Sequence, residues 1–138
     1  MPVNGRRKGH DFEREMTRAF RELMPGDPTI RRGLQYRDGA EAPDVETQFF
    51  HVECKRGRKP NPRAALAQAE RDCDPNRRPI AIIKDDRCKP FVVMSFELFS
   101  ELVRLTGIGG AYDRDGCRTS EPGSSAKRHA GIAGVVPG

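Results

Sequence analysis

The chain has 138 residues, 36% of them hydrophobic and 33% charged, so it can bury one modest core and is expected to form a single domain. Its 25 Lys and Arg residues against 20 Asp and Glu residues give a net charge of +5, a moderate basic excess that suits a polyanionic partner if the basic residues cluster. The four cysteines contain no CxxC pair and no segment is apolar enough to cross a bilayer, which argues against a zinc knuckle, a disulfide framework, secretion and membrane anchoring and favours a cytoplasmic location.

The first half of the chain is predicted to contain one helix and three strands. Apolar residues recur at helical spacing over residues 11–24, and the Pro-Gly pair that follows ends this helix. Residues 29–37 are predicted to form a short strand, followed by a polar, glycine-containing loop over residues 38–42. Residues 44–55 are predicted to form two strands joined by a tight turn near Thr47-Gln48.

The second half is predicted to contain a helix, two strands and a last helix. Residues 61–73 begin with Asn-Pro, which is typical of a helix N-cap and first turn, and continue as an alanine-rich helix. Residues 79–84 are a short apolar run suited to a strand covered on both faces, and residues 91–94 are predicted to be another strand. Residues 95–106 begin with a serine suited to an N-cap and have the apolar spacing of a helix.

Together these elements predict an α/β fold with a mixed central sheet flanked by helices, in the order α-β-β-β-α-β and then β-α. Residues 1–106 are expected to form the domain. Residues 107–138 are rich in glycine, serine and charge and have no periodic apolar pattern. They are therefore expected to be a flexible C-terminal tail, or an arm that contacts nucleic acid or a partner.

A candidate chemical site lies in residues 44–55. Because side chains alternate along a strand, Glu53 and Lys55 are predicted to share one face, and a hairpin would place Asp44 across from Glu53. Phosphodiester hydrolysis needs hard oxygen ligands for a divalent cation, which Asp44 and Glu53 can provide. Lys55 can then orient the attacking water or stabilise charge on the phosphate. The alternative is that Asp44 only follows a turn proline and that Glu53 and Lys55 form a solvated charge pattern.

A third acid is expected from the first helix. At 100° per residue, Glu13 lies at the edge of the buried stripe, whereas Glu15 points to the opposite side. Glu13 is thus the better candidate to reach inward, and a boundary salt bridge with a neighbouring arginine is the alternative. Glu46 shares the strand face of Asp44 and could replace it as a ligand. His51 shares the face of Glu53, where packing is the commoner role of a lone histidine.

Basic residues recur in pairs and triplets beside these acids. Such spacing suits a polyanion that runs across one face, and a soluble surface of mixed sign is the alternative. The candidate DNA-binding residues are Arg6, Arg7, Lys8, Arg31, Arg32, Arg56, Arg58 and Lys59.

The motifs Lys8-Gly9, Glu13-Arg14, Pro43-Asp44 and Glu53-Cys54-Lys55 resemble those of archaeal-type Holliday junction resolvases and related phage or bacterial PD-(D/E)XK nucleases, over about residues 6–105. The resemblance implies a restriction-endonuclease-like core. It also implies that Asp44 and Glu53 bind Mg²⁺ (or Mn²⁺), that Lys55 assists catalysis, and that Glu13 adds an acidic contact to the metal site.

For resolvases, the resemblance further implies attack by water on a phosphate of branched DNA, and a homodimer that cuts two strands symmetrically in a prokaryotic or phage-infected cell. Residues 38–42 differ from the Gly- and Ser-rich loop that such resolvases often carry before the Pro-Asp. A repair, recombination or restriction-type nuclease acting on duplex or single-stranded DNA, and a non-catalytic nucleic-acid-binding module, are therefore alternatives.

Two further features leave alternatives open. Gln68 resembles the glutamine that some relatives place near the site, although an ordinary polar residue on a helix surface would look the same. Phe96, Phe99 and Leu102 are a candidate dimer face, which core packing explains equally well.

Overall fold

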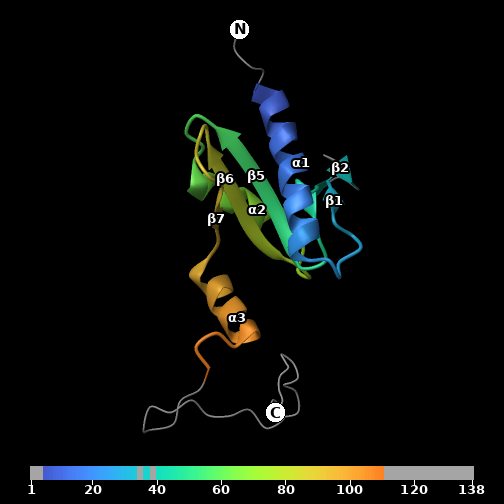
Figure 1. Cartoon of the computed structure of the whole chain (residues 1–138), viewed down its shortest axis with the longest axis vertical. Coiled ribbons are helices and arrows are strands. Elements are labelled where there is room, and N and C mark those ends of the chain that lie inside the picture. The colour runs from blue at the N-terminus through green and yellow to red at the C-terminus, as the bar shows by residue number, and fades with distance from the viewer. Residues whose placement is uncertain (1–4, 34–35, 38–39, 111–138) are drawn as a thin grey trace, which may run out of the picture. The chain divides into compact units, whose positions relative to one another are not determined.

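The structure of the chain is a computed structural model in which residues 5–33, 36–37 and 40–110 are described. Figure 1 shows the helices and strands, and the described part contains a five-stranded mixed sheet in the order β1-β4-β5-β6-β7 and a two-stranded sheet of β2 and β3. The elements are α1 (Gly5–Leu23), β1 (Arg31–Arg32), β2 (Tyr36–Arg37), β3 (Ala40–Glu41), β4 (Val45–Glu46), β5 (Phe50–Gly57), α2 (Pro62–Asp72), β6 (Arg78–Asp85), β7 (Phe91–Val93) and α3 (Phe96–Thr106).

The chain divides into two compact units, Met1–Phe99 and Ser100–Gly138, with the boundary inside α3. The first unit contains the whole sheet, together with α1 and α2. The predicted flexible tail falls almost entirely on residues 111–138, which lie outside the described residues. Within the described ranges, none of the helices has the length and apolar character needed to cross a membrane.

Strand β5 is the centre of the sheet and is covered on both faces. It pairs antiparallel with β4 and parallel with β6, and α2 makes the connection that parallel pairing requires. The ring of Phe50 lies 6.4 Å from that of Phe20, so the even-numbered face of β5 packs against α1. On the other face, Ala81 and Ile83 of β6 form a buried cluster with Ala65 of α2. The two helices therefore cover opposite faces, which makes this a three-layer α/β structure.

Local hydrogen bonds explain where several predicted elements begin. Asn61 accepts from the backbone N–H of Ala64 at 3.1 Å, and Ser95 accepts from that of Leu98 at 3.1 Å, so both predicted N-caps are confirmed. The Thr47 hydroxyl accepts from the backbone N–H of Phe50 at 2.7 Å and closes the predicted turn. The strand predicted over residues 79–84 is also confirmed and is buried through its middle.

The strand predicted over residues 29–37 is wrong as one continuous element. Only Arg31–Arg32 joins the sheet, and Tyr36–Arg37 pairs instead with Ala40–Glu41, inside the segment predicted to be a loop. The chain leaves the main sheet at Gly33, whose backbone N–H donates to the Asp44 carbonyl at 3.0 Å. Helix α1 also begins six residues before the predicted start, because its polar and basic first turns have no apolar periodicity to mark them.

Candidate acidic site beside the central strands

Asp44 is fixed where β4 meets β5. Its backbone N–H donates to the Val52 carbonyl at 2.8 Å, and its Oδ2 accepts from the backbone N–H of Cys54 at 2.7 Å. The predicted hairpin is confirmed, with Val45 paired to Val52. Because Cys54 directly follows Glu53, these two backbone contacts hold the Asp44 carboxyl group beside that of Glu53.

Glu53 and Lys55 share a face of β5, as the strand alternation predicted. Lys55 Nζ lies 2.7 Å from Glu53 Oε1. The Glu53 side chain is 5% exposed and that of Lys55 is 39% exposed, so the carboxyl group is buried while the ammonium group reaches the surface. This arrangement gives a buried acid with a cation at its solvent side.

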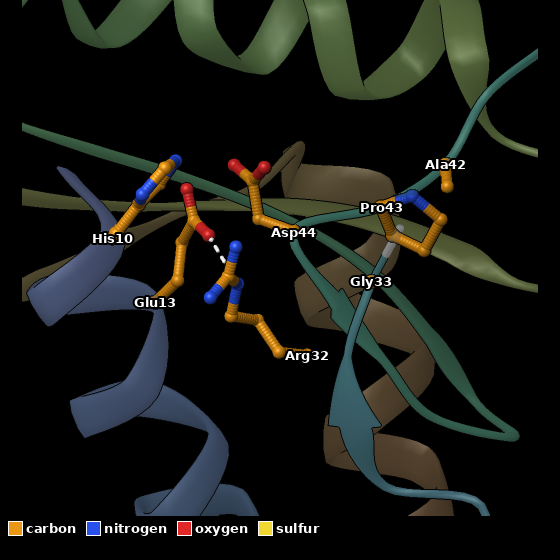
Figure 2. A pocket seen from close by; sticks show the side chains of 7 residues that line it. All are labelled: His10, Glu13, Arg32, Gly33, Ala42, Pro43 and Asp44. Carbon is orange, nitrogen blue, oxygen red and sulfur yellow. Dashed lines mark ion pairs between the residues drawn. The ribbon is translucent and has the colours of Figure 1, made fainter. Parts of the chain in front are cut away.

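Glu13 reaches the same region from α1. Figure 2 shows that Glu13 and Asp44 line one pocket, together with His10, Arg32, Gly33, Ala42 and Pro43. The volume of this pocket is about 40 Å³. The Glu13 carboxylate is 2.9 Å from Arg32 Nε, and its side chain is 18% exposed. Glu13 thus lines a pocket with Asp44 and also forms the salt bridge with a neighbouring arginine that was its alternative role.

The charge of Asp44 changes the ionisation of both Glu53 and Glu13. Burial and the charge of Asp44 raise the pKa of Glu53 from 4.5 to about 7. Burial also raises the pKa of Asp44, against the opposing effects of the Cys54 N–H and of Lys55. Burial and the Asp44 charge raise the pKa of Glu13 as well, while Arg32 and His10 act in the opposite direction. A cation placed among these groups would relieve their repulsion.

The donor set fits a hard divalent cation held by two carboxylates. Asp44 and Glu53 are close enough for a side-chain hydrogen bond between them. Mg²⁺ is commonly bound by one or two carboxylates, with waters and substrate phosphate as its other ligands. Among the residues that the structure describes, no group of three or more His, Cys, Asp or Glu side chains is arranged to hold a metal ion. Glu13, which is paired with Arg32, adds negative charge beside the pair and does not complete a three-acid group.

Other acidic and polar candidates lie away from the pair. Glu46 forms a 2.6 Å ion pair with Arg31 and lines a different pocket from Asp44. His51 is buried, and burial lowers its pKa against the charge of Asp72. Gln68 lies partly exposed on α2, the helix that covers the face of β5 bearing Glu53.

The predicted DNA-binding residues differ in their contacts and exposure. Lys8, Arg31 and Arg32 form ion pairs within the chain, with Asp86, Glu46 and Glu13 respectively. The exposed members of the set are Arg6, Arg7, Arg31, Arg58 and Lys59, and the partly buried members are Lys8, Arg32 and Arg56. The basic pairs of the sequence therefore do not act as one uniform surface.

Sequence reasoning missed Gly33 and His10. A Cβ atom at Gly33 would lie 1.7 Å from the Pro43 carbonyl oxygen, so only glycine allows β1 to approach the backbone that carries Asp44. A glycine that interrupts a strand pattern is the sequence signal for such a close approach. His10 lines the acidic pocket one helical turn before Glu13, and that i to i+3 spacing could have indicated it.

The raised pKa of Glu53 predicts a pH-dependent stability in the presence of a chelator. Protonated Glu53 stabilises the folded state fully below about pH 4.5, and that contribution is lost as the pH rises through about 7. In Glu53→Gln the contribution does not titrate. Between pH 5 and 8, we expect the Tm of the native chain to fall relative to that of Glu53→Gln by roughly 5 to 10 °C. Thermal melts followed by circular dichroism test this, and parallel Tm curves for the two proteins would contradict it.

The chemical capacity of the site comes from its charges. The buried Glu53 and the partly buried Asp44 can bind a hard cation, Glu53 ionises near neutral pH, and Lys55 supplies a positive charge beside them. No protein-family model, curated protein or solved structure matches this chain.

Proposed function

We propose that the chain is a metal-dependent endonuclease that hydrolyses phosphodiester bonds in DNA, with Asp44 and Glu53 as ligands to Mg²⁺ (or Mn²⁺). The observation that carries this proposal is the buried Glu53 carboxyl group, with the partly buried carboxyl group of Asp44 beside it and Lys55 Nζ 2.7 Å from its Oε1. A purely structural acid pair at this position would be costly, because burial and mutual repulsion both oppose ionisation. Carboxyl groups with a pKa raised as far as that of Glu53 cluster at functional sites.

The order of the elements supports a restriction-endonuclease-like core. Helix α1, strands β1, β4 and β5, helix α2 and strand β6 follow the α-β-β-β-α-β order that the sequence resemblance implies. The small β2–β3 sheet is an insertion between the first two of these strands. In this proposal, Asp44 corresponds to the aspartate of the PD-(D/E)XK motif, and Glu53 and Lys55 correspond to its acid and lysine.

Each residue then has a distinct task. A bound divalent ion would polarise the scissile phosphate and lower the pKa of a water molecule. Asp44 is held in place by the Cys54 N–H, which orients its carboxylate toward Glu53. Glu53 must lose its proton to act as a ligand, and the neighbouring Lys55 ammonium favours that loss. Lys55 also places a positive charge where the phosphate gains negative charge in the transition state.

Branched DNA and a homodimer are parts of the same proposal. The unit Met1–Phe99 leaves large apolar side chains exposed near its C-terminal end, with Phe96 80% exposed, Val92 50% and Phe99 50%. Core packing does not account for Phe96 and Phe99, since both are exposed. An apolar surface of this kind supports association of two copies, and light scattering of the purified chain measures it.

The test of the proposed function is cleavage of a labelled four-way junction, its matching linear duplex and a single strand, with Mg²⁺ or with chelator, by the native chain and by Glu53→Gln. We expect Mg²⁺-dependent cutting that favours the junction and is lost in Glu53→Gln. Equal cutting of junction and duplex would contradict the branched substrate alone. Binding of all three without cutting would contradict the nuclease and favour a nucleic-acid-binding module.

A further inference from the structure

The exposed side of α1 carries an unusual separation of charge. At 100° per residue, four arginines fall within an arc of about 60° on the side of the helix away from its buried residues. They are Arg7, Arg14, Arg18 and Arg21, and together they form what we call the arginine strip. Three acids of the helix fall on the neighbouring arc: Asp11 and Glu22, which are exposed, and Glu15, which is partly exposed.

Contacts with β6 and with the residue before β1 show which way each arc of α1 faces. Glu15, on the acidic arc, forms an ion pair with Lys84 of β6. Arg21, at the end of the arginine strip, donates to the Ile30 carbonyl beside β1 at 3.1 Å. The strip therefore runs along the flank of α1 that faces β1, which is also the flank of the acidic pocket.

Two hollows follow this flank and meet the acidic pocket. One, of about 390 Å³, is lined by Arg14, Thr17, Arg18, Arg21 and Arg32. The other, of about 360 Å³, is lined by Arg6, Arg7, His10, Asp11 and Arg14. Arg14 belongs to both hollows. Arg32 and His10 each also line the pocket that contains Glu13 and Asp44, so the hollows reach the acidic site from two directions.

We propose that the arginine strip, with Arg32, binds the phosphate backbone of one strand of DNA and leads that strand across the acidic site. This inference rests on the proposed nuclease function and adds the path of the substrate. The strip extends over about 21 Å from Arg7 to Arg21, at 1.5 Å per helical residue. A strand of B-DNA passes about six nucleotides over that length, at 3.4 Å each. Three of the four strip arginines, Arg14, Arg18 and Arg21, belong to none of the basic pairs that the sequence singles out.

Other uses of a basic helix fit the structure less well. A basic amphipathic helix that lies on a membrane needs an apolar face to insert, but Phe12, Met16 and Phe20 of α1 are buried against the sheet. Arg14 does pair with Asp11 at 3.0 Å, but both side chains are more than half exposed. Such a surface pair is worth little and can be exchanged for a phosphate contact at small cost.

The experiment is a salt titration of binding to a labelled linear DNA duplex, in chelator so that no cutting occurs. Each phosphate contact contributes about 0.9 to the slope of log K against log salt concentration. We expect Arg18→Ala to reduce the magnitude of the slope by about 0.9, and Arg14→Ala with Arg18→Ala to reduce it by about 1.8. The matched control is Arg71→Ala in the last turn of α2, because Arg71 lines neither of the two hollows along the strip. Arg71 is 66% exposed and pairs with a neighbouring aspartate, as Arg14 does.

A native slope in the Arg14→Ala and Arg18→Ala double variant would overturn the proposal. An equal reduction of the slope in Arg71→Ala would also overturn it. So would a slope that falls only when Arg58 and Lys59 are replaced, because the phosphate contacts would then lie in the loop after β5. The cleavage assay with Glu53→Gln separates this outcome from failure of the nuclease. If the strip variants lower the slope but the native chain does not cut DNA, the proposed DNA path stands and the proposed nuclease function fails. If the native chain cuts DNA but the strip variants keep the native slope, the nuclease function stands and the DNA path fails.

Discussion

Replacing Asp44 by asparagine is expected to reduce Mg²⁺-dependent DNA cleavage by at least about 100-fold while leaving the fold intact, because changes even to the partners of metal ligands cost about 10- to 100-fold. The asparagine side-chain oxygen can still accept from the backbone N–H of Cys54, so the β4–β5 contact is preserved. The substitution removes the negative charge of one of the two carboxylates that are proposed to bind the metal. Cleavage rates measured over a Mg²⁺ series test this, and a native rate in Asp44→Asn would contradict the assignment.

The matched control for Asp44→Asn is Glu46→Gln. Glu46 is a buried acid of β4, two residues after Asp44, but it pairs with Arg31 and lines a different pocket. We expect Glu46→Gln to cut at close to the native rate, which would exclude Glu46 as the replacement ligand.

Asp44→Asn should also lower the pKa of Glu53, since the Asp44 charge contributes to raising it. A chelator-treated variant that is at least as stable as the native chain at pH 8 would show that lost cutting is not lost folding.

Gly33→Ala is expected to destabilise the chain by about 3 kcal/mol or more, at the upper end of overpacking effects, and to lower cleavage as well. The added Cβ would lie 1.7 Å from the Pro43 carbonyl oxygen, which is backbone and cannot rotate away. Relief requires β1 to separate from the Pro43–Asp44 segment, which breaks the Gly33 N–H contact to Asp44. Urea unfolding gives the change in stability, and cleavage per folded molecule gives the change at the site.

Gly26→Ala is the control for the glycine substitution. A Cβ at Gly26 would have nothing within 4 Å, and its φ lies outside the positive region. We expect the free energy of unfolding of Gly26→Ala to stay within about 0.5 kcal/mol of the native value. If both alanine variants behave alike, the close approach at Gly33 does not control the position of Asp44.

The features that sequence predicted well are local ones. The alternation of side chains along β5 was enough to place Glu53 beside Lys55, and the short connection to Asp44 was enough to predict the hairpin. The N-caps at Asn61 and Ser95 were also readable, because a cap depends on residues within one turn. Helical projection placed Glu13 at the edge of the core, which the structure confirms.

The features that sequence missed depend on contacts between distant segments. Gly33 can signal a close approach of backbone, but nothing in the sequence identifies Pro43 as the segment that approaches it, so the end of β1 could not be placed. The ion pairs of Lys8 with Asp86 and of Arg31 with Glu46 likewise join residues far apart in the chain. A charged residue looks available to a ligand in the sequence whether or not folding pairs it within the chain, so these ion pairs could not be predicted.

The acid pair is assembled by the shortest connection in the main sheet. Val45 meets Val52 through a tight turn, whereas the parallel pairing of Phe50 with Arg78 must close a loop that contains the whole of α2. Shorter loops lose less entropy on closing, so the hairpin is the part of the sheet that can form first during folding. The carboxyl groups of Asp44 and Glu53 then come together while water still surrounds them, before the helices cover β5. The two carboxyl groups can thus come together early at small electrostatic cost, because water screens their charges. Most of their repulsion arises in the last steps of folding, when the helices pack on the sheet and exclude water.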